Sequence, residues 1–147
     1  MADFYQTGNI ITLHRLGRPN LERIEAELLE FSKQRPIALA LPALYTEFQA
    51  NALKGIIDEL KKVKYLNEVV LTLGRATDEE FKKAKDFMSQ LPYEVKIIHN
   101  EGKRIKEIYA TLERNGLWAG EDGKGRSAWI AYGYILLLHL KLCPDQK

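Results

Sequence analysis

The sequence has little cysteine: Cys143 is the only one among 147 residues. A lone cysteine excludes a disulfide framework within the chain, and its position near the end of the sequence gives it no base or metal partner, so we expect it to be inert. A domain of this length buries enough apolar surface to fold without such cross-links.

An excess of one charge is also missing. Twenty-two Lys and Arg residues stand against twenty Asp and Glu residues, which leaves a net charge of +2. The basic residues are dispersed, which argues against a nucleic-acid surface built from bulk positive charge. Hydrophobic residues make up 46% and charged residues 29%, a composition that excludes a disordered or fibrous chain and indicates a globular protein.

No hydrophobic run is long enough for a membrane helix. The most apolar stretch, residues 128–142, is shorter than the roughly 20 residues that span a bilayer, so we expect a buried helix there and no membrane span. The N-terminal residues MADFYQTGN lack the layout of a signal peptide. The expected location is therefore the cytoplasm.

Three short apolar runs are present, at residues 37–41, 67–73 and 93–99, and each is followed by a segment with helical periodicity. Strands that alternate with helices predict an α/β fold: a Rossmann-like parallel sheet with helices on both faces. A strand-like run at residues 10–13 and a helix opened by Pro19-Asn20 form a leader over residues 1–35, and residues 36–147 form the α/β domain. No strand follows residues 128–142, so the sheet looks truncated.

Helix boundaries are marked at several points. Helical spacing covers residues 49–64, Thr77 or Asp78 caps the next helix, and Asn115-Gly116 ends the one after that. The strand at residues 37–41 has no charge and is predicted to be buried on both faces. The segment from Pro42 to Glu47 follows it, where open α/β sheets hold their ligands.

A second candidate segment is Gly123-Lys124-Gly125, at the entrance of the last helix. Free backbone N–H groups and a lysine make a sensible anion site there, although the spacing is not a Walker A motif. The alternative is a flexible loop with a solvated lysine. Glu121 and Asp122 are similarly either a carboxylate pair or solvated loop residues. The histidines lie too far apart to predict a metal site: His14, His99 and His139.

Three features follow one another along the chain: Leu41-Pro42-Ala43-Leu44 with Glu47, a second strand that ends in Gly74, and Gly123-Lys124-Gly125 before a helix rich in aromatic residues. In this order they resemble nucleotide-sugar glycosyltransferases of the GT-A fold. Within that group the chain resembles the N-terminal part of the retaining glucosyl-3-phosphoglycerate synthases and their mannosyl relatives. The resemblance covers about residues 36–135.

The resemblance implies a role for six residues. It assigns Pro42, Ala43, Leu44 and Glu47 to the base and ribose, Gly74 to the second loop, and Lys124 to the donor nucleotide. The implied ligand is a UDP- or GDP-hexose, and the implied acceptor is 3-phosphoglycerate. The chain departs from the family in having Tyr45 instead of a polar residue, and Gly74-Arg75-Ala76 instead of an acidic-serine loop.

The family also uses an Asp-x-Asp motif that binds Mg²⁺ or another divalent cation, and no Asp-x-Asp occurs in the sequence. We therefore expect no metal ligands, no catalytic residues and no turnover from this chain. The competing interpretation is a non-catalytic Rossmann-like binding or interaction domain. Self-association through the apolar helix at residues 128–142 is a further expectation.

Overall fold

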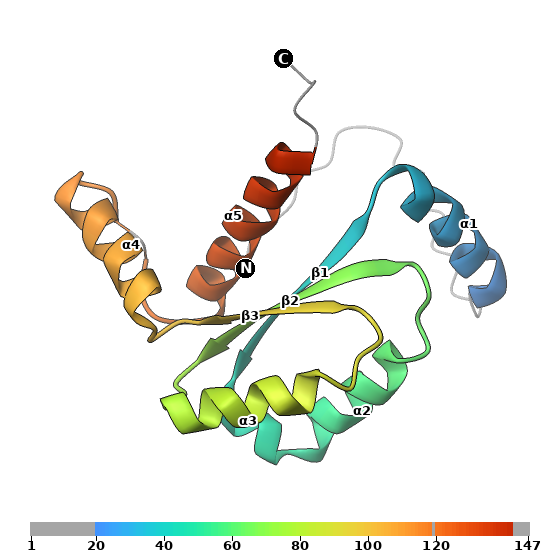
Figure 1. Ribbon diagram of the computed structural model, residues 1–147, viewed down its shortest axis with the longest axis horizontal. Helices are drawn as coiled ribbons and strands as arrows, with labels where there is room; N and C mark the ends of the chain where they lie inside the picture. Colours follow the sequence, from blue (N-terminus) through green and yellow to red (C-terminus); the bar gives the residue numbers. More distant parts are fainter. Residues whose placement is uncertain (1–19, 119, 143–147) are drawn as a thin grey trace, which may run out of the picture.

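The computed structural model describes residues 20–118 and 120–142, which form a three-stranded parallel sheet flanked by helices (Figure 1). The strands are β1 (Ile37–Leu44), β2 (Leu66–Gly74) and β3 (Glu94–His99), in the spatial order β1-β2-β3. Helix α2 (Asn51–Leu60) links β1 to β2, and α3 (Asp78–Met88) links β2 to β3. The predicted α/β, Rossmann-like class is confirmed.

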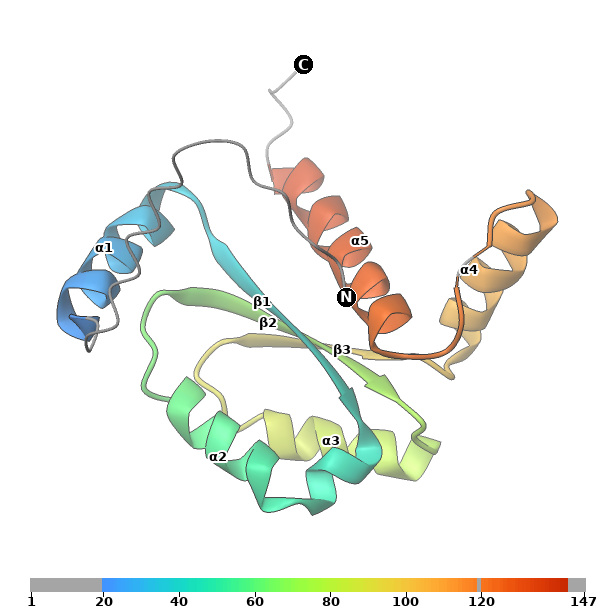
Figure 2. The same ribbon diagram turned by 180° about the vertical axis from the view of Figure 1, so that it is seen from behind.

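Helices cover both faces of the sheet, as predicted. Two successive crossovers of the same hand place α2 and α3 on one face. The last helix, α5 (Lys124–Leu142), lies across the other face and packs on β1 and β2 (Figures 1 and 2). Between β3 and α5, helix α4 (Lys103–Arg114) projects from the carboxyl end of β3. The carboxyl ends of the strands therefore meet the beginnings of α4 and α5.

The central strand is β2, which pairs with a neighbour on each side. Its residues from Val69 to Gly74 are all buried, whereas in β1 only Ala43 is. The prediction that the strand at residues 37–41 is fully buried is wrong: these residues are half-buried, because β1 has a neighbouring strand on one side only in the described part of the chain. This edge position explains why β1 runs on through Pro42: proline lacks an N–H to donate and is tolerated at sheet edges.

The main core lies between β2 and the α2 and α3 helices. Successive side chains of a strand point to opposite faces, so Val69 and Leu71 point to the same side. They pack with Leu53 and Ile57 of α2 and with Met88 of α3. Each fully buried side chain of this size contributes about 1.5–3 kcal/mol through the hydrophobic effect. This layer fixes the sheet on which the candidate site is built.

Several predicted helix ends are observed. Asn20 caps α1 (Leu21–Gln34), Thr77 caps α3, and Gly116 follows α4 with a positive φ of 70°. Helix α1 has no fully buried residue, and its Leu28 and Leu29 are half-buried. The strand expected at residues 10–13 lies outside them.

Helix α5 begins at Lys124, earlier than the predicted start at residue 128. The amide of Ser127 donates to the carbonyl oxygen of Gly123 at 3.1 Å, which closes the first turn over the glycine-lysine-glycine segment. The predicted start at residue 128 rests on apolar residues alone, and an apolar pattern gives no signal for a first helical turn made of polar residues and glycine. In the part of the chain that the structure describes, no helix is long and apolar enough to cross a bilayer.

Candidate functional site

The structure brings Glu47 and Lys124 together at the carboxyl end of the sheet. Glu47 lies in the 3₁₀ helix η1 (Tyr45–Gln49), which follows β1 directly, and Lys124 is the first residue of α5. Their Nζ and Oε1 atoms are 3.5 Å apart, with 72% of the lysine side chain and 39% of the glutamate side chain exposed. An ion pair this exposed contributes at most about 1 kcal/mol, so a ligand can replace it at little cost.

Leu44 and Gly74 are the last residues of β1 and β2 and are neighbours in the β1–β2 register. A Cβ atom added to Gly74 would lie 3.3 Å from Leu44 Cδ2 and 3.4 Å from Asn100 Nδ2. The first distance is shorter than an ordinary van der Waals contact, and the second is at its lower limit. The close approach of Asn100, and not only a ligand, therefore gives position 74 a reason to be glycine.

Pro42 and Ala43 lie inside β1 and not in a loop beyond it. Ala43 is 5% exposed and belongs to the apolar core, so its methyl group is not available to a ligand. Pro42 is paired in register with Thr72. Of the nominated residues, Leu44, Glu47, Gly74 and Lys124 reach the carboxyl edge of the sheet, whereas Pro42 and Ala43 precede it.

A second group of charged side chains lies beside the first. Asp122 accepts a hydrogen bond from Arg126 Nη2 at 2.7 Å, and its other oxygen is 3.8 Å from Arg75 Nε. The backbone N–H of Arg75 donates to Glu101 Oε1 at 2.7 Å. A diphosphate bound at this edge would therefore compete with Glu47 for Lys124, and with Asp122 for Arg75 and Arg126.

One buried and one half-buried polar contact attach α5 to the end of β3 and to α4. Asn100, which is 7% exposed, donates from Nδ2 to Ser127 Oγ at 2.8 Å. The guanidinium carbon of Arg126 lies 4.5 Å from the centre of the Tyr109 ring, a cation–π contact. Burial raises the pKa of the Tyr109 hydroxyl, while the nearby Arg126 opposes this shift, so the phenol stays protonated at neutral pH.

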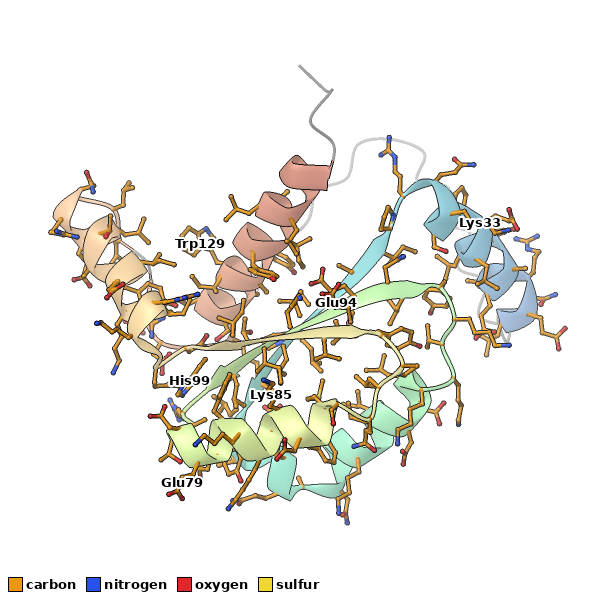
Figure 3. The ribbon with its side chains drawn as sticks, viewed as in Figure 1. Lys33, Glu79, Lys85, Glu94, His99 and Trp129 are labelled. Atoms are coloured by element: carbon orange, nitrogen blue, oxygen red, sulfur yellow. The ribbon has the colours of Figure 1, made fainter. Side chains whose placement is uncertain are left out.

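Two cavities flank α5. One, of about 680 Å³, lies between β3, α4 and α5 and is mainly apolar, with Arg104 and His99 among its lining residues. The other, of about 560 Å³, is lined by both tryptophans of the sequence, Trp118 and Trp129, together with Glu121 and Arg126. Figure 3 shows Trp129 on the side of α5 that faces α4.

His99, at the end of β3, is held by contacts within the protein. His99 Nε2 donates to the carbonyl oxygen of Ala76 at 2.7 Å, and its ring stacks on Phe81 with centroids 4.8 Å apart. Figure 3 shows this histidine at the end of β3 beside α3. Within residues 20–118 and 120–142, no group of three or more His, Cys, Asp and Glu side chains could hold a metal ion.

Glu121 and Asp122 do not act as a carboxylate pair. Asp122 binds arginines, whereas Glu121 is exposed and lines the cavity with the tryptophans. Sequence reasoning missed Arg75, Asn100 and Arg126. The four-residue spacing of Asp122 and Arg126 at the start of a helix is a signal that could have revealed one of these contacts.

No protein-family model matches the chain, and no solved structure matches it. Two curated relatives do. The chain is 50% identical over 136 residues to a glucosyl-3-phosphoglycerate synthase from Persephonella marina, an alignment that covers 92% of this chain and 34% of that protein. It is 31% identical over 136 residues to a glucosyl-3-phosphoglycerate synthase from Methanococcoides burtonii, covering 92% and 33%.

The chain thus spans about one third of the length of the curated relatives that it matches. The resemblance predicted from Leu41-Pro42-Ala43-Leu44, Gly74 and Gly123-Lys124-Gly125 is confirmed. Over nearly its whole length, this chain is a homologue of part of the glucosyl-3-phosphoglycerate synthases.

Proposed function

We propose that this chain is the nucleotide-sugar-binding portion of a retaining glycosyltransferase that transfers a hexose from a UDP- or GDP-sugar to 3-phosphoglycerate. The observation that carries the proposal is the 50% identity to a glucosyl-3-phosphoglycerate synthase, together with the convergence of Glu47 and Lys124. Both side chains stand where open parallel sheets hold ligands, beyond the carboxyl ends of the strands.

The two charged residues would have different tasks. Glu47 can accept hydrogen bonds from hydroxyl groups of the ribose, while the Lys124 ammonium and the amino end of α5 attract the diphosphate. Because the Glu47–Lys124 pair is weak, Lys124 can turn from the carboxylate to a phosphate oxygen. The leaving diphosphate of sugar transfer also calls for a divalent cation in the family, and ligands for that cation are not found in the described residues.

Replacement of Lys124 by alanine should weaken UDP binding by about one to two decades, because a charge-assisted hydrogen bond contributes about 1.5–3 kcal/mol. Uridine, which lacks phosphate, should bind equally well to both proteins. Isothermal titration calorimetry with uridine, UDP and GDP measures this difference. Glu47→Ala is the matched comparison and should weaken uridine and UDP alike. Equal losses of UDP and uridine affinity on Lys124→Ala would contradict the assignment.

A non-catalytic interaction domain is the second candidate. It is favoured by the exposed apolar side chains of α5, which include Trp129, Tyr132, Leu136 and Leu137. If the wild-type chain binds neither UDP nor GDP in the same titrations, this candidate becomes the better one.

A further inference from the structure

The side chain of Lys124 extends into solvent, and its partner Glu47 holds it only weakly. Its position therefore depends on the backbone of the segment Gly123-Lys124-Gly125. A Cβ atom added at Gly123 or Gly125 would meet nothing within 4 Å, so packing against these two glycines does not fix the segment. The first-turn hydrogen bond from the Ser127 amide to the Gly123 carbonyl oxygen holds the segment on its helical side, and neighbouring side chains must fix the rest.

Asp122 precedes this segment and forms ion pairs with two arginines from different elements. Arg126, in the first turn of α5, binds Asp122 Oδ1 at 2.7 Å, and only 23% of its side chain is exposed. The same guanidinium lies over the ring of Tyr109 in α4. Because Arg126 is held by an aromatic ring below and a carboxylate beside it, it is a fixed anchor for Asp122.

The second arginine comes from the end of β2. Arg75 has a positive φ of 54°, a left-handed conformation that costs a non-glycine residue about 1–2 kcal/mol. The hydrogen bond from its N–H to Glu101 stabilises this conformation, and the Arg75 side chain reaches Asp122, with Nε 3.8 Å from Oδ2. Asp122 thus connects the end of β2 with the start of α5.

We propose that Asp122 is a positioning residue: through Arg75 and Arg126 it fixes the glycine-lysine-glycine segment so that Lys124 stands opposite Glu47, ready to bind phosphate. The part that concerns phosphate rests on the proposed function. Asp122 itself need not touch the ligand, and as an anion it would repel a phosphate at short range.

Because of this repulsion, the sign of the change in UDP affinity distinguishes a positioning role of Asp122 from a purely electrostatic one. Asp122→Asn removes a negative charge near the phosphate site, so an electrostatic role alone predicts tighter UDP binding. A positioning role predicts the opposite sign, a loss of about three- to tenfold, with uridine affinity unchanged. In a Lys124→Ala background the same substitution should cause no further loss. Glu121→Gln is the matched control, because it neutralises the adjacent carboxylate without removing an arginine contact.

A second measurement does not need a nucleotide. The ¹⁵N–{¹H} heteronuclear NOE of the Gly123, Lys124 and Gly125 amides should fall in Asp122→Asn and stay at the wild-type value in Glu121→Gln, with the melting temperature of both variants near that of the wild type. Unchanged NOE values, or UDP affinity that is unchanged or higher in Asp122→Asn, would overturn the positioning role. If the wild type binds no nucleotide, the proposed function fails, and the NOE values alone decide whether Asp122 orders the segment.

Discussion

At the scale of single residues, charged side chains around the sheet lie in two different environments. Those of the candidate site are half-exposed and paired, as in the 3.5 Å contact of Lys124 and Glu47. Glu68 of β2 is different, because its Oε1 atom is buried and has no hydrogen-bond partner. Burial, followed by the neighbouring carboxylate of Glu94, raises the pKa of Glu68, and Lys96 only partly offsets this.

This pKa direction predicts how stability changes with pH. In the folded chain Glu68 holds its proton to a higher pH than in the unfolded chain. Its contribution to the free energy of unfolding is therefore complete below the unfolded pKa of about 4.3 and is lost as the pH rises through the raised pKa of the folded state. Glu68→Gln should therefore gain stability relative to wild type as the pH increases from 4 to 7. Urea unfolding at several pH values measures the difference, and the exposed Glu79→Gln is the control (Figure 3). A difference that does not change with pH would contradict the burial of this carboxylate.

At the scale of elements, short sequence signals define where the helices begin. The start of α3 is a reciprocal capping box: the Glu80 amide donates to Thr77 Oγ1 at 3.3 Å, and the Thr77 amide donates to Glu80 Oε2 at 2.8 Å. Helix α3 covers β2 and β3 from below in Figure 1, so its start also fixes the loop that follows Gly74. Local chemistry at this cap thus holds the end of the loop at residues 75–77.

Thr77→Ala should destabilise the chain by about 1 kcal/mol, because the first turn of α3 loses a hydrogen-bond acceptor. Thr77→Ser keeps the hydroxyl group and should recover most of the loss. The midpoint of urea unfolding at constant m value reports both variants. Equal destabilisation by alanine and serine would show that the methyl group, and not the cap, matters at this position.

At the scale of the whole molecule, the described chain leaves apolar surface uncovered on α5. Trp129 and Tyr132 are 53% and 58% exposed, and Leu136 and Leu137 are each 61% exposed. Ile130 and Ala131 on the same helix are buried against the sheet. Large contiguous apolar patches are uncommon on monomers and usually mark interaction sites.

We therefore expect the chain to self-associate at tens of micromolar. Leu136→Glu should shift sedimentation velocity profiles toward the monomer, because it introduces a charge into the contact. Ile56→Glu, at a similarly apolar and 45% exposed position on α2, should leave the profiles unchanged. A clean monomer for the wild type would remove α5 as a self-association surface.

A second prediction at the scale of the whole molecule concerns catalytic turnover. With UDP- or GDP-glucose, Mg²⁺ and 3-phosphoglycerate, the chain should form no glucosylated product, because it has no Asp-x-Asp motif and no metal-binding cluster among the described residues. The Persephonella marina relative serves as the positive control in the same assay. Product formed above background by this chain would show that other residues replace the missing ligands.

The sequence by itself determined the elements and their order. Strand and helix periods, the caps at Thr77 and Gly116, and the apolar runs of β2 and β3 are local properties, so the α/β class and parallel sheet were predictable. The family resemblance was predictable for a related reason, since it rests on short motifs in a fixed order along the chain.

Tertiary structure alone decided which residues meet. Whether β1 or β2 is central depends on pairing partners, and no pattern within β1 reports that it lies at an edge. The burial of Ala43, the left-handed backbone of Arg75 and the contact of Arg126 with Tyr109 join segments far apart in the sequence. Lys124 and Glu47 could be nominated one at a time from their motifs. Their pairing at 3.5 Å, and the link from Asp122 to the end of β2, arise only when α5 packs back across the sheet.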